Sequence, residues 1–273
     1  VLDAATEVAH RMTDAAGEIV LPYFRTPLQV EDKQLTEEMS PVTIADRAAE
    51  SAMRAILAET FPTHSIFGEE HGFTEGSDPD WTWVLDPIDG TKSFITGKPL
   101  FGVLVSLLYK GVPVLGIIDQ PVLRERWVGV QGRKTTLNGS ELAARDCGEL
   151  SEAYLYATTP HMFEGWTAPA FDALRGRVRV PLYGCDCYAY GLLAAGHCDL
   201  VVEATMMPYD YMALVPVIQG AGGVITDWQG GQLRWDGPAE ADGARRQPQE
   251  VLAAGGPRVH AACLEQLRQY ADA

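Results

Sequence analysis

This sequence is organised around one stretch, Trp83-Val84-Leu85-Asp86-Pro87-Ile88-Asp89-Gly90-Thr91. An apolar run ends there in two carboxylates, and a threonine hydroxyl follows two residues after the second. Carboxylates repel one another and are costly to desolvate, so a fold that gathers them needs a cation to neutralise them. Pro87 fixes one backbone φ angle, and Asp89-Gly90 is typical of a tight turn. The stretch therefore predicts a strand that stops, then a loop of hard oxygen ligands suited to Mg²⁺ or Ca²⁺.

Length, composition and charge narrow the class of protein. The 273 residues are enough for one large domain or two small ones, and 47% hydrophobic and 21% charged residues are ordinary for a globular enzyme. The net charge of −16 argues against a nucleic acid or an anionic membrane surface as partner. The longest apolar run, 100–109, is too short to span a bilayer. A phosphate substrate would need local cations to offset the negative field.

The cysteines indicate the redox compartment. There are five, and an odd number in a chain of this length does not suggest a disulfide scaffold. No export signal is visible at the N-terminus, so we expect reduced thiols and a cytoplasmic location. Cys185-x-Cys187 with His197-Cys198 has poor spacing for a zinc site, and buried apolar cysteines are common, so we do not expect zinc there.

The first half of the chain has the pattern of an α+β unit. Apolar positions at helical spacing are followed by strands, and Lys110-Gly111 and Asn138-Gly139 are typical of hairpin turns. The expected helices are 3–24 and 45–59, and the expected strands are 81–85, 101–109, 112–119 and 126–130. Helices followed by antiparallel strands predict an α+β domain, placed at residues 1–145.

The second half alternates strands and helices. The expected strands are 153–158, 178–183, 200–203, 224–228 and 251–254, and the expected helices are 171–174, 188–195, 211–219 and 258–270. This alternation predicts an α/β domain at residues 146–273. Residues 236–250, rich in Pro, Gly, Ala and charge, are interpreted as a surface insertion. The glycines at 220–223 follow a helix and precede a strand, which is the wrong order for a dinucleotide-binding loop.

Two further segments favour a metal site over a solvated turn with incidental acids. In Gly68-Glu69-Glu70-His71-Gly72, strand alternation would turn one glutamate inward and leave its neighbour in solvent. Asp210 precedes a helix, where it is either a plain N-cap or a cap that also faces a cleft. Asp46 lies in the first turn of the second helix, where it would complement the helix dipole. The acids that together would form a cage are Glu69, Asp86, Asp89 and Asp210.

These motifs resemble the inositol monophosphatase family, the magnesium-dependent, lithium-sensitive phosphatases. The resemblance covers about residues 33–254, and the hexapeptide from Asp86 to Thr91 is its most specific part. It implies a layered αβαβα sandwich, usually dimeric, so we expect a homodimer. It also implies two to three Mg²⁺ ions. The first would be held by Glu69, Asp86 and the Ile88 carbonyl, the second by Asp86, Asp89 and Asp210, and a third, weaker ion would share Glu69.

The resemblance also implies the remaining roles in the site. Thr91, matched with Asp46, would orient the attacking water and help to deprotonate it, with Glu69 beside them. The backbone amides of Gly90 and Thr91 would hold the phosphate, as suits a helix N-terminus. The residues expected to bind substrate are Asp89, Gly90, Thr91, Gly184, Cys185, Asp186, Glu203 and Asp210.

Two carboxylates, Asp186 and Glu203, suggest the substrate. The family resemblance places both on the leaving-group side, where they would favour a cationic ester, because an ammonium gains attraction there and a neutral polyol gains only hydrogen bonds. Segments 184–190 and 208–218 look like the histidinol-phosphate phosphatase branch of the family. We therefore expect L-histidinol phosphate as substrate, in histidine biosynthesis. An inositol-1-phosphatase or a broad small-phosphate phosphatase is the alternative, and a metal-binding regulatory protein is the non-enzymatic one.

Overall fold

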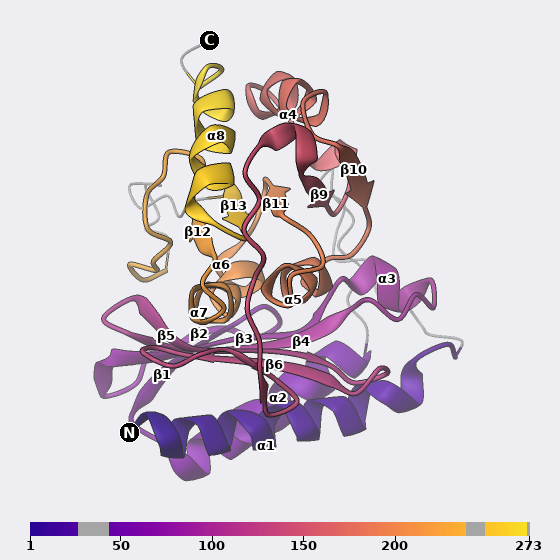
Figure 1. Cartoon of the computed structure of the whole chain (residues 1–273). Coiled ribbons are helices and arrows are strands. Elements are labelled where there is room, and N and C mark those ends of the chain that lie inside the picture. Colours follow the sequence, from indigo (N-terminus) through magenta and orange to yellow (C-terminus); the bar gives the residue numbers. More distant parts are fainter. Residues whose placement is uncertain (27–43, 239–248, 272–273) are drawn as a thin grey trace.

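The structure, a computed structural model, describes residues 1–26, 44–238 and 249–271. It has five layers, as Figure 1 shows. Helices α1 (Leu2–Val20) and α2 (Ile44–Thr60) cover one face of an eight-stranded sheet. A middle layer of helices separates that sheet from a five-stranded sheet, and two further helices cover the far side. The expected αβαβα sandwich is confirmed.

The eight-stranded sheet is mixed, with order β2-β1-β3-β4-β5-β6-β7-β8. β1 and β3 run parallel, and the other neighbours are antiparallel. Lys110, Gly111, Asn138 and Gly139 all have positive φ, which confirms both predicted hairpin turns. The strands are β1 (His64–Gly68), β2 (Gly72–Thr74), β3 (Asp78–Asp89), β4 (Gly102–Tyr109), β5 (Val112–Gln120), β6 (Glu125–Val130), β7 (Thr136–Leu137) and β8 (Ser140–Glu141).

The five-stranded sheet has order β10-β9-β11-β13-β12, with β9, β10 and β11 parallel and β13 antiparallel to its neighbours. Its strands are β9 (Tyr154–Ala157), β10 (Val180–Tyr183), β11 (Leu200–Glu203), β12 (Val224–Thr226) and β13 (Val251–Ala254). The other helices are α3 (Thr91–Ile95), α4 (Thr167–Arg175), α5 (Tyr188–Ala194), α6 (Pro208–Tyr211), α7 (Leu214–Gly220) and α8 (Pro257–Arg268). Short 3₁₀ turns are η1 (Leu21–Tyr23), η2 (Leu150–Glu152) and η3 (Pro160–Met162).

Three apolar clusters join these layers. One packs α1 and α2 on the large sheet, and another packs α4 and α8 on the small sheet. The third fills the space between the sheets and includes Trp127 from β6 and Tyr190 from α5. Gly129 allows α7 to approach the large sheet, because a Cβ there would collide with the backbone of Pro216. The helices of the middle layer therefore pack closely against the large sheet.

Some sequence-based boundaries are wrong. The helix expected at 211–219 is two helices, α6 and α7, and Pro216 lies in the first turn of α7, where it breaks no intrahelical hydrogen bond and needs no kink. The helix expected at 171–174 begins four residues earlier, at Thr167. Most of the 236–250 insertion lies outside the described residues, and the domain boundary at 145/146 stays a prediction. Within the described ranges, no helix has the length and apolar character that a membrane crossing requires.

Candidate active site

The Asp86–Thr91 stretch forms the end of β3 and the start of α3. The strand does not stop before Asp86, as the sequence predicted, but continues to Asp89 through a bulge. Asp86 pairs with Leu104 and Asp89 with Gly102, so β3 holds one residue more than β4 between these pairs. A bulge redirects the side chains around it. The Oδ1 atom of Asp86 accepts the Ile88 N–H at 3.1 Å, which fixes its carboxylate within the bulge.

Asp86, Asp89 and Asp210 form one group of converging carboxylates. Each offers an oxygen that lies within 4.8 Å of those of the other two, and Asp86 is only 1% exposed. Asp210 comes from α6 in the second half of the chain. It is the third residue of that helix rather than its N-cap, and its Oδ2 accepts the Met207 N–H at 2.7 Å. Its local capping role and its place in the group are thus compatible.

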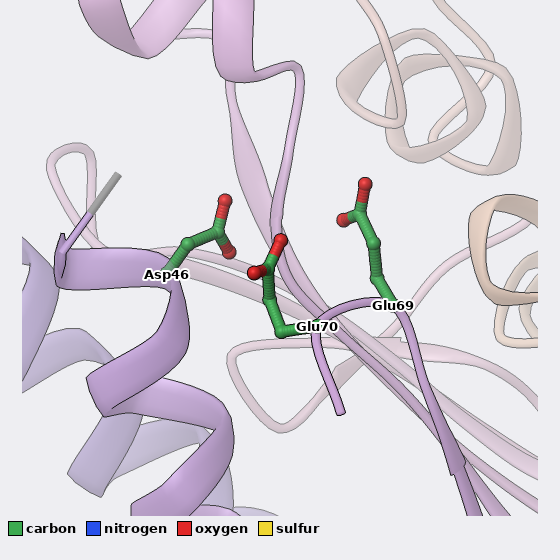
Figure 2. A group of neighbouring side chains, drawn as sticks. All are labelled: Asp46, Glu69 and Glu70. Carbon is green, nitrogen blue, oxygen red and sulfur yellow. The ribbon is translucent and has the colours of Figure 1, made fainter. Parts of the chain in front are cut away.

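Asp46, Glu69 and Glu70 form a second group, shown in Figure 2. Asp46 comes from α2, and both glutamates come from the turn between β1 and β2. Their oxygens also lie within 4.8 Å of one another. The sequence predicted only one inward glutamate, so Glu70 was missed. Strand alternation does not apply to the pair, because it lies in a turn, where neighbouring side chains need not point to opposite sides.

The two groups of carboxylates lie close enough to affect each other's pKa values. Burial raises the pKa of Asp86 well above its usual value, and the charges of Glu69, Asp89, Asp210 and Asp46 raise it further. Burial, with the charge of Asp186, raises the pKa of Asp89 to about 8, although hydrogen bonds from Cys187 oppose this. So many carboxylates cannot all be ionised together without a cation. An all-oxygen donor set of this kind fits Mg²⁺.

Gly90 and Thr91 begin α3 beside these carboxylates. Gly90 has φ +83, a left-handed conformation, and a Cβ on it would lie 2.8 Å from Cγ of Asp186. Glycine is therefore required there by both backbone conformation and space. The Thr91 hydroxyl donates to the Ile88 carbonyl at 3.1 Å. The hydroxyl thus adjoins the carbonyl that the sequence resemblance assigns to an ion.

The loop that holds Gly184, Cys185 and Asp186 is attached directly to this stretch. The Cys187 N–H donates to Oδ2 of Asp89 at 2.6 Å, and the Ser93 hydroxyl donates to Oδ2 of Asp186 at 2.7 Å. Lys98 Nζ donates to the Gly184 carbonyl at 2.6 Å. Burial raises the pKa of Asp186, although the Ser93 hydrogen bond and the charges of two lysines lower it. The two halves of the chain therefore meet at Asp89.

Glu203 lies deeper than expected for a residue that contacts substrate. It is 2% exposed; its Oε1 accepts the Thr158 N–H at 2.9 Å and its Oε2 accepts the Tyr190 hydroxyl at 2.8 Å. Burial raises its pKa, and these hydrogen bonds lower it. Cys185 is buried, and burial raises the pKa of its thiol. Throughout the part of the chain that the structure describes, each group with metal-ligand geometry consists of carboxylates, without cysteine or histidine.

The comparisons with known proteins agree with this fold. The sequence model of the inositol monophosphatase family matches residues 1–271. With the two carboxylate groups, this match defines a metal-dependent phosphatase of small phosphate monoesters. The chain belongs to the inositol monophosphatase family, whose members use Mg²⁺.

Individual relatives give a finer comparison. The chain is 52% identical over 270 residues to the bifunctional phosphatase IMPL2, chloroplastic, of Arabidopsis thaliana, covering 98% of this chain and 76% of that protein. It is 33% identical over 253 residues to a histidinol-phosphatase of Chlorobaculum parvum, covering 92% and 96%. Its structure matches that of an inositol monophosphatase from Zymomonas mobilis with a TM-score of 0.85 at 44% identity, covering 98% and 99%. The family and fold expected from the sequence are confirmed, and the individual residue roles stay predictions.

Proposed function

We propose that this chain hydrolyses L-histidinol phosphate to L-histidinol and phosphate in histidine biosynthesis, with Mg²⁺ as cofactor. The observation that supports this substrate is the position of Asp186, whose carboxylate lies directly against Gly90 at the start of α3. A substrate held by its phosphate at Gly90 would bring its alcohol portion close to Asp186. An ammonium or imidazolium there gains a charge-assisted hydrogen bond that a neutral polyol lacks.

The residues of the site would have three roles, namely metal binding, activation of water and phosphate binding. Bound Mg²⁺ would neutralise the phosphate oxygens and lower the pKa of a water. The residues that would hold the ions are Glu69, Asp86, the Ile88 carbonyl, Asp89 and Asp210. Thr91, matched with Asp46, would orient the attacking water, and the Asp46 carboxylate would accept its proton. The Thr91 hydroxyl lies at the Ile88 carbonyl, and Asp46 belongs to the second group. The amides of Gly90 and Thr91 would hold the phosphate in line for attack by water.

A second candidate is an inositol-1-phosphatase or a broad phosphatase of small esters. The similarity to the Zymomonas mobilis protein, described as an inositol monophosphatase, favours it. The similarity to the Chlorobaculum parvum histidinol-phosphatase favours the first candidate. Overall sequence identity cannot separate the two, because a substrate preference depends on the few residues around the alcohol portion.

The test is steady-state hydrolysis of L-histidinol phosphate and inositol-1-phosphate by the same preparation, with Mg²⁺ and with EDTA. We expect kcat/KM at least tenfold higher for L-histidinol phosphate, a difference of about 1.4 kcal/mol in transition-state binding. EDTA should abolish both activities. Equal rates, or faster hydrolysis of inositol-1-phosphate, would overturn the proposed substrate and leave the phosphatase class in place.

The assembly and location of the protein are separate proposals. We propose a homodimer, as the family resemblance implies, and sedimentation equilibrium tests it. We also propose a cytoplasmic location on the basis of the free cysteines. The printed name of the Arabidopsis thaliana relative describes that protein as chloroplastic. Fractionation of source cells compares these two locations.

A further inference from the structure

Glu50 is a buried carboxylate close to the second acidic group, and neither the sequence interpretation nor the proposed function assigns it a role. It is 0% exposed and lies one helical turn after Asp46 in α2. Asp46, Glu50 and Arg54 are spaced by four residues, so they share one face of the helix. That face meets the turn between β1 and β2, which carries Glu69 and Glu70.

The Glu50 carboxylate binds this turn through its backbone. Its Oε2 accepts the Glu70 N–H at 2.7 Å, and its Oε1 accepts the His71 N–H at 3.2 Å. Arg54 Nε donates to the same Oε1 at 2.7 Å. The Arg54 guanidinium also donates hydrogen bonds to the Thr74 hydroxyl at 3.0 Å and to the Gly72 carbonyl. Glu50 thus accepts three hydrogen bonds and has its own cation, which offsets the cost of burying its charge.

The other side of the turn is fixed by β3. The Glu69 N–H donates to the Leu85 carbonyl at 3.2 Å, and Gly68 pairs with Leu85 in the parallel register of β1 and β3. This pairing places Glu69 beside Asp86, the residue after Leu85. Three consecutive N–H groups are therefore engaged, one by β3 and two by Glu50. Together they set the direction in which the two glutamate side chains leave the turn.

Gly68 provides the space that this arrangement needs. A Cβ at position 68 would collide with Oε1 and Cδ of Glu50. The φ of Gly68 is not in the left-handed region that favours glycine, so the requirement is for space rather than for backbone freedom. A side chain at this position would displace the Glu50 carboxylate from beneath the turn. The position of the Glu50 carboxylate therefore depends on a glycine at position 68.

We infer that Glu50 is a positioning residue for magnesium binding, an inference that rests on the proposed function. It orients Glu69 toward Asp86 by fixing the next two backbone amides, while α2 also supplies Asp46. A carboxylate is needed because its two oxygens accept both amides and the guanidinium together. A glutamine has one carbonyl oxygen for these three donors, and its own NH₂ group would face one of them. The loss of an outer hydrogen-bonding partner of a metal ligand costs about 10- to 100-fold in metal affinity.

Two variants test the inference from independent directions, E50Q and G68A. The first removes the charge, and the second retains every acidic residue but displaces the Glu50 carboxylate. Titration calorimetry with MgCl₂ measures the affinity of the metal-free protein, and the rise in Tm on adding Mg²⁺ gives a second readout. We expect both variants to bind Mg²⁺ at least tenfold more weakly than wild type and to gain less Tm from it.

Asp199 offers a matched control, D199N. It is also a buried carboxylate, bound by Arg145 through two hydrogen bonds of 2.6 Å and by the Tyr154 N–H at 2.7 Å, but it belongs to the five-stranded sheet region. D199N should lower the metal-free Tm and leave the Mg²⁺ affinity unchanged. If E50Q and G68A behave in the same way, Glu50 is only structural and the inference is overturned. If wild type itself binds no Mg²⁺, the proposed function is overturned and the inference with it.

Discussion

Two strands of the large sheet bury carboxylates in opposite electrostatic surroundings. Asp119, in β5, is 5% exposed, and its Oδ1 accepts a hydrogen bond from Nε of Arg126 at 2.6 Å. Asp86, in β3, is 1% exposed, and its strongest charged influences are other acids. Burial raises the pKa of both, but only Asp119 has an arginine that lowers it again. The structural carboxylate has its own cation within the fold, whereas we propose that the Asp86 group takes its cation from solution.

The Asp119 site also has further partners that the Asp86 site lacks. Arg126 donates to Asp14 at 2.7 Å and lies 3.1 Å from Nδ1 of His10, both in α1. These residues line a groove of about 920 Å³ between α1 and the sheet. The network is thus a closed set of charges that joins two layers. The Asp86 group instead assembles acids from α6 and β3, and the second group, Asp46, Glu69 and Glu70, lies beside it.

Removal of the Asp86 carboxylate should have the strongest effect on activity. Asp86→Asn should lower kcat/KM roughly a thousandfold, because it weakens the binding of the cation that stabilises charge in the transition state. The same variant should not lose stability in EDTA, because it removes one charge from a group of acids that repel one another. Phosphate release assays and urea unfolding in EDTA check the two results. A large loss of metal-free stability would show that Asp86 is a structural carboxylate.

Asp119→Asn is the converse experiment. It leaves Arg126 with a weakened set of partners, so the free energy of unfolding should fall by about 2 kcal/mol, while kcat/KM stays at the wild-type value. Asp14→Asn is the matched control in the same network. Asp14 is 64% exposed, so its ion pair should contribute less than about 1 kcal/mol. A loss of activity in Asp119→Asn would mean that the network and the candidate active site are coupled.

The third effect concerns pH. The pKa of Asp89 is raised to about 8, from 3.8. The folded metal-free protein therefore favours the protonated carboxyl, and the stability from this preference is present below about pH 4 and lost as pH rises through about 8. Saturating Mg²⁺ should reverse this trend, because the ion competes with the proton. Tm measured across this pH range in EDTA and in Mg²⁺ checks it, and parallel profiles would contradict it.

The sequence was informative where chemistry is local. The Asp86–Thr91 stretch, the hairpin turns at Lys110-Gly111 and Asn138-Gly139, and the order of the longer elements follow from short patterns. The short strands β2, β7 and β8 were not predicted. The break between α6 and α7 and the continuation of β3 through a bulge do not follow from such patterns. The end of β3 is held by its pairing with β4, a segment that lies further along the chain. Identifying Asp86 and Asp89 as a pair of acids needs only the sequence.

The features of the site that the sequence did not predict depend on contacts between distant segments of the chain. Gly90 is required in part because Asp186 lies against it, 96 positions later in the chain. Glu50 appears in the sequence as an ordinary acid on a helix, and only the fold places it under the β1–β2 turn. A spacing of four residues from Asp46 was visible, but the same spacing is common on solvated helix faces. Sequence patterns identify ligands more readily than the residues that hold them.

Asp186 is intermediate between the two kinds of carboxylate. It has a hydroxyl partner in Ser93 and two lysines near enough to lower its pKa, yet burial still raises that pKa. Asp186→Asn should lower kcat/KM for L-histidinol phosphate about tenfold and change inositol-1-phosphate much less, because only the first loses a charge-assisted contact. Glu203→Gln provides a comparison of the same kind at the second carboxylate. This variant should also lower the free energy of unfolding, because Glu203 is buried and accepts hydrogen bonds from Thr158 and Tyr190. Equal losses for both esters would contradict the charge argument.

The smallest effect belongs to His10. Burial lowers its pKa from 6.5, the charge of Arg126 lowers it further, and the charge of Asp14 opposes this. A histidine whose pKa is lowered by folding contributes stability that is present above pH 6.5 and lost as pH falls through the folded-state pKa. His10→Gln should remove this component from the pH profile of urea unfolding. The Asp119 network has its own cation in Arg126, so the contribution of His10 to stability should be the same in EDTA and in Mg²⁺. With rising pH this contribution increases, whereas that of Asp89 decreases.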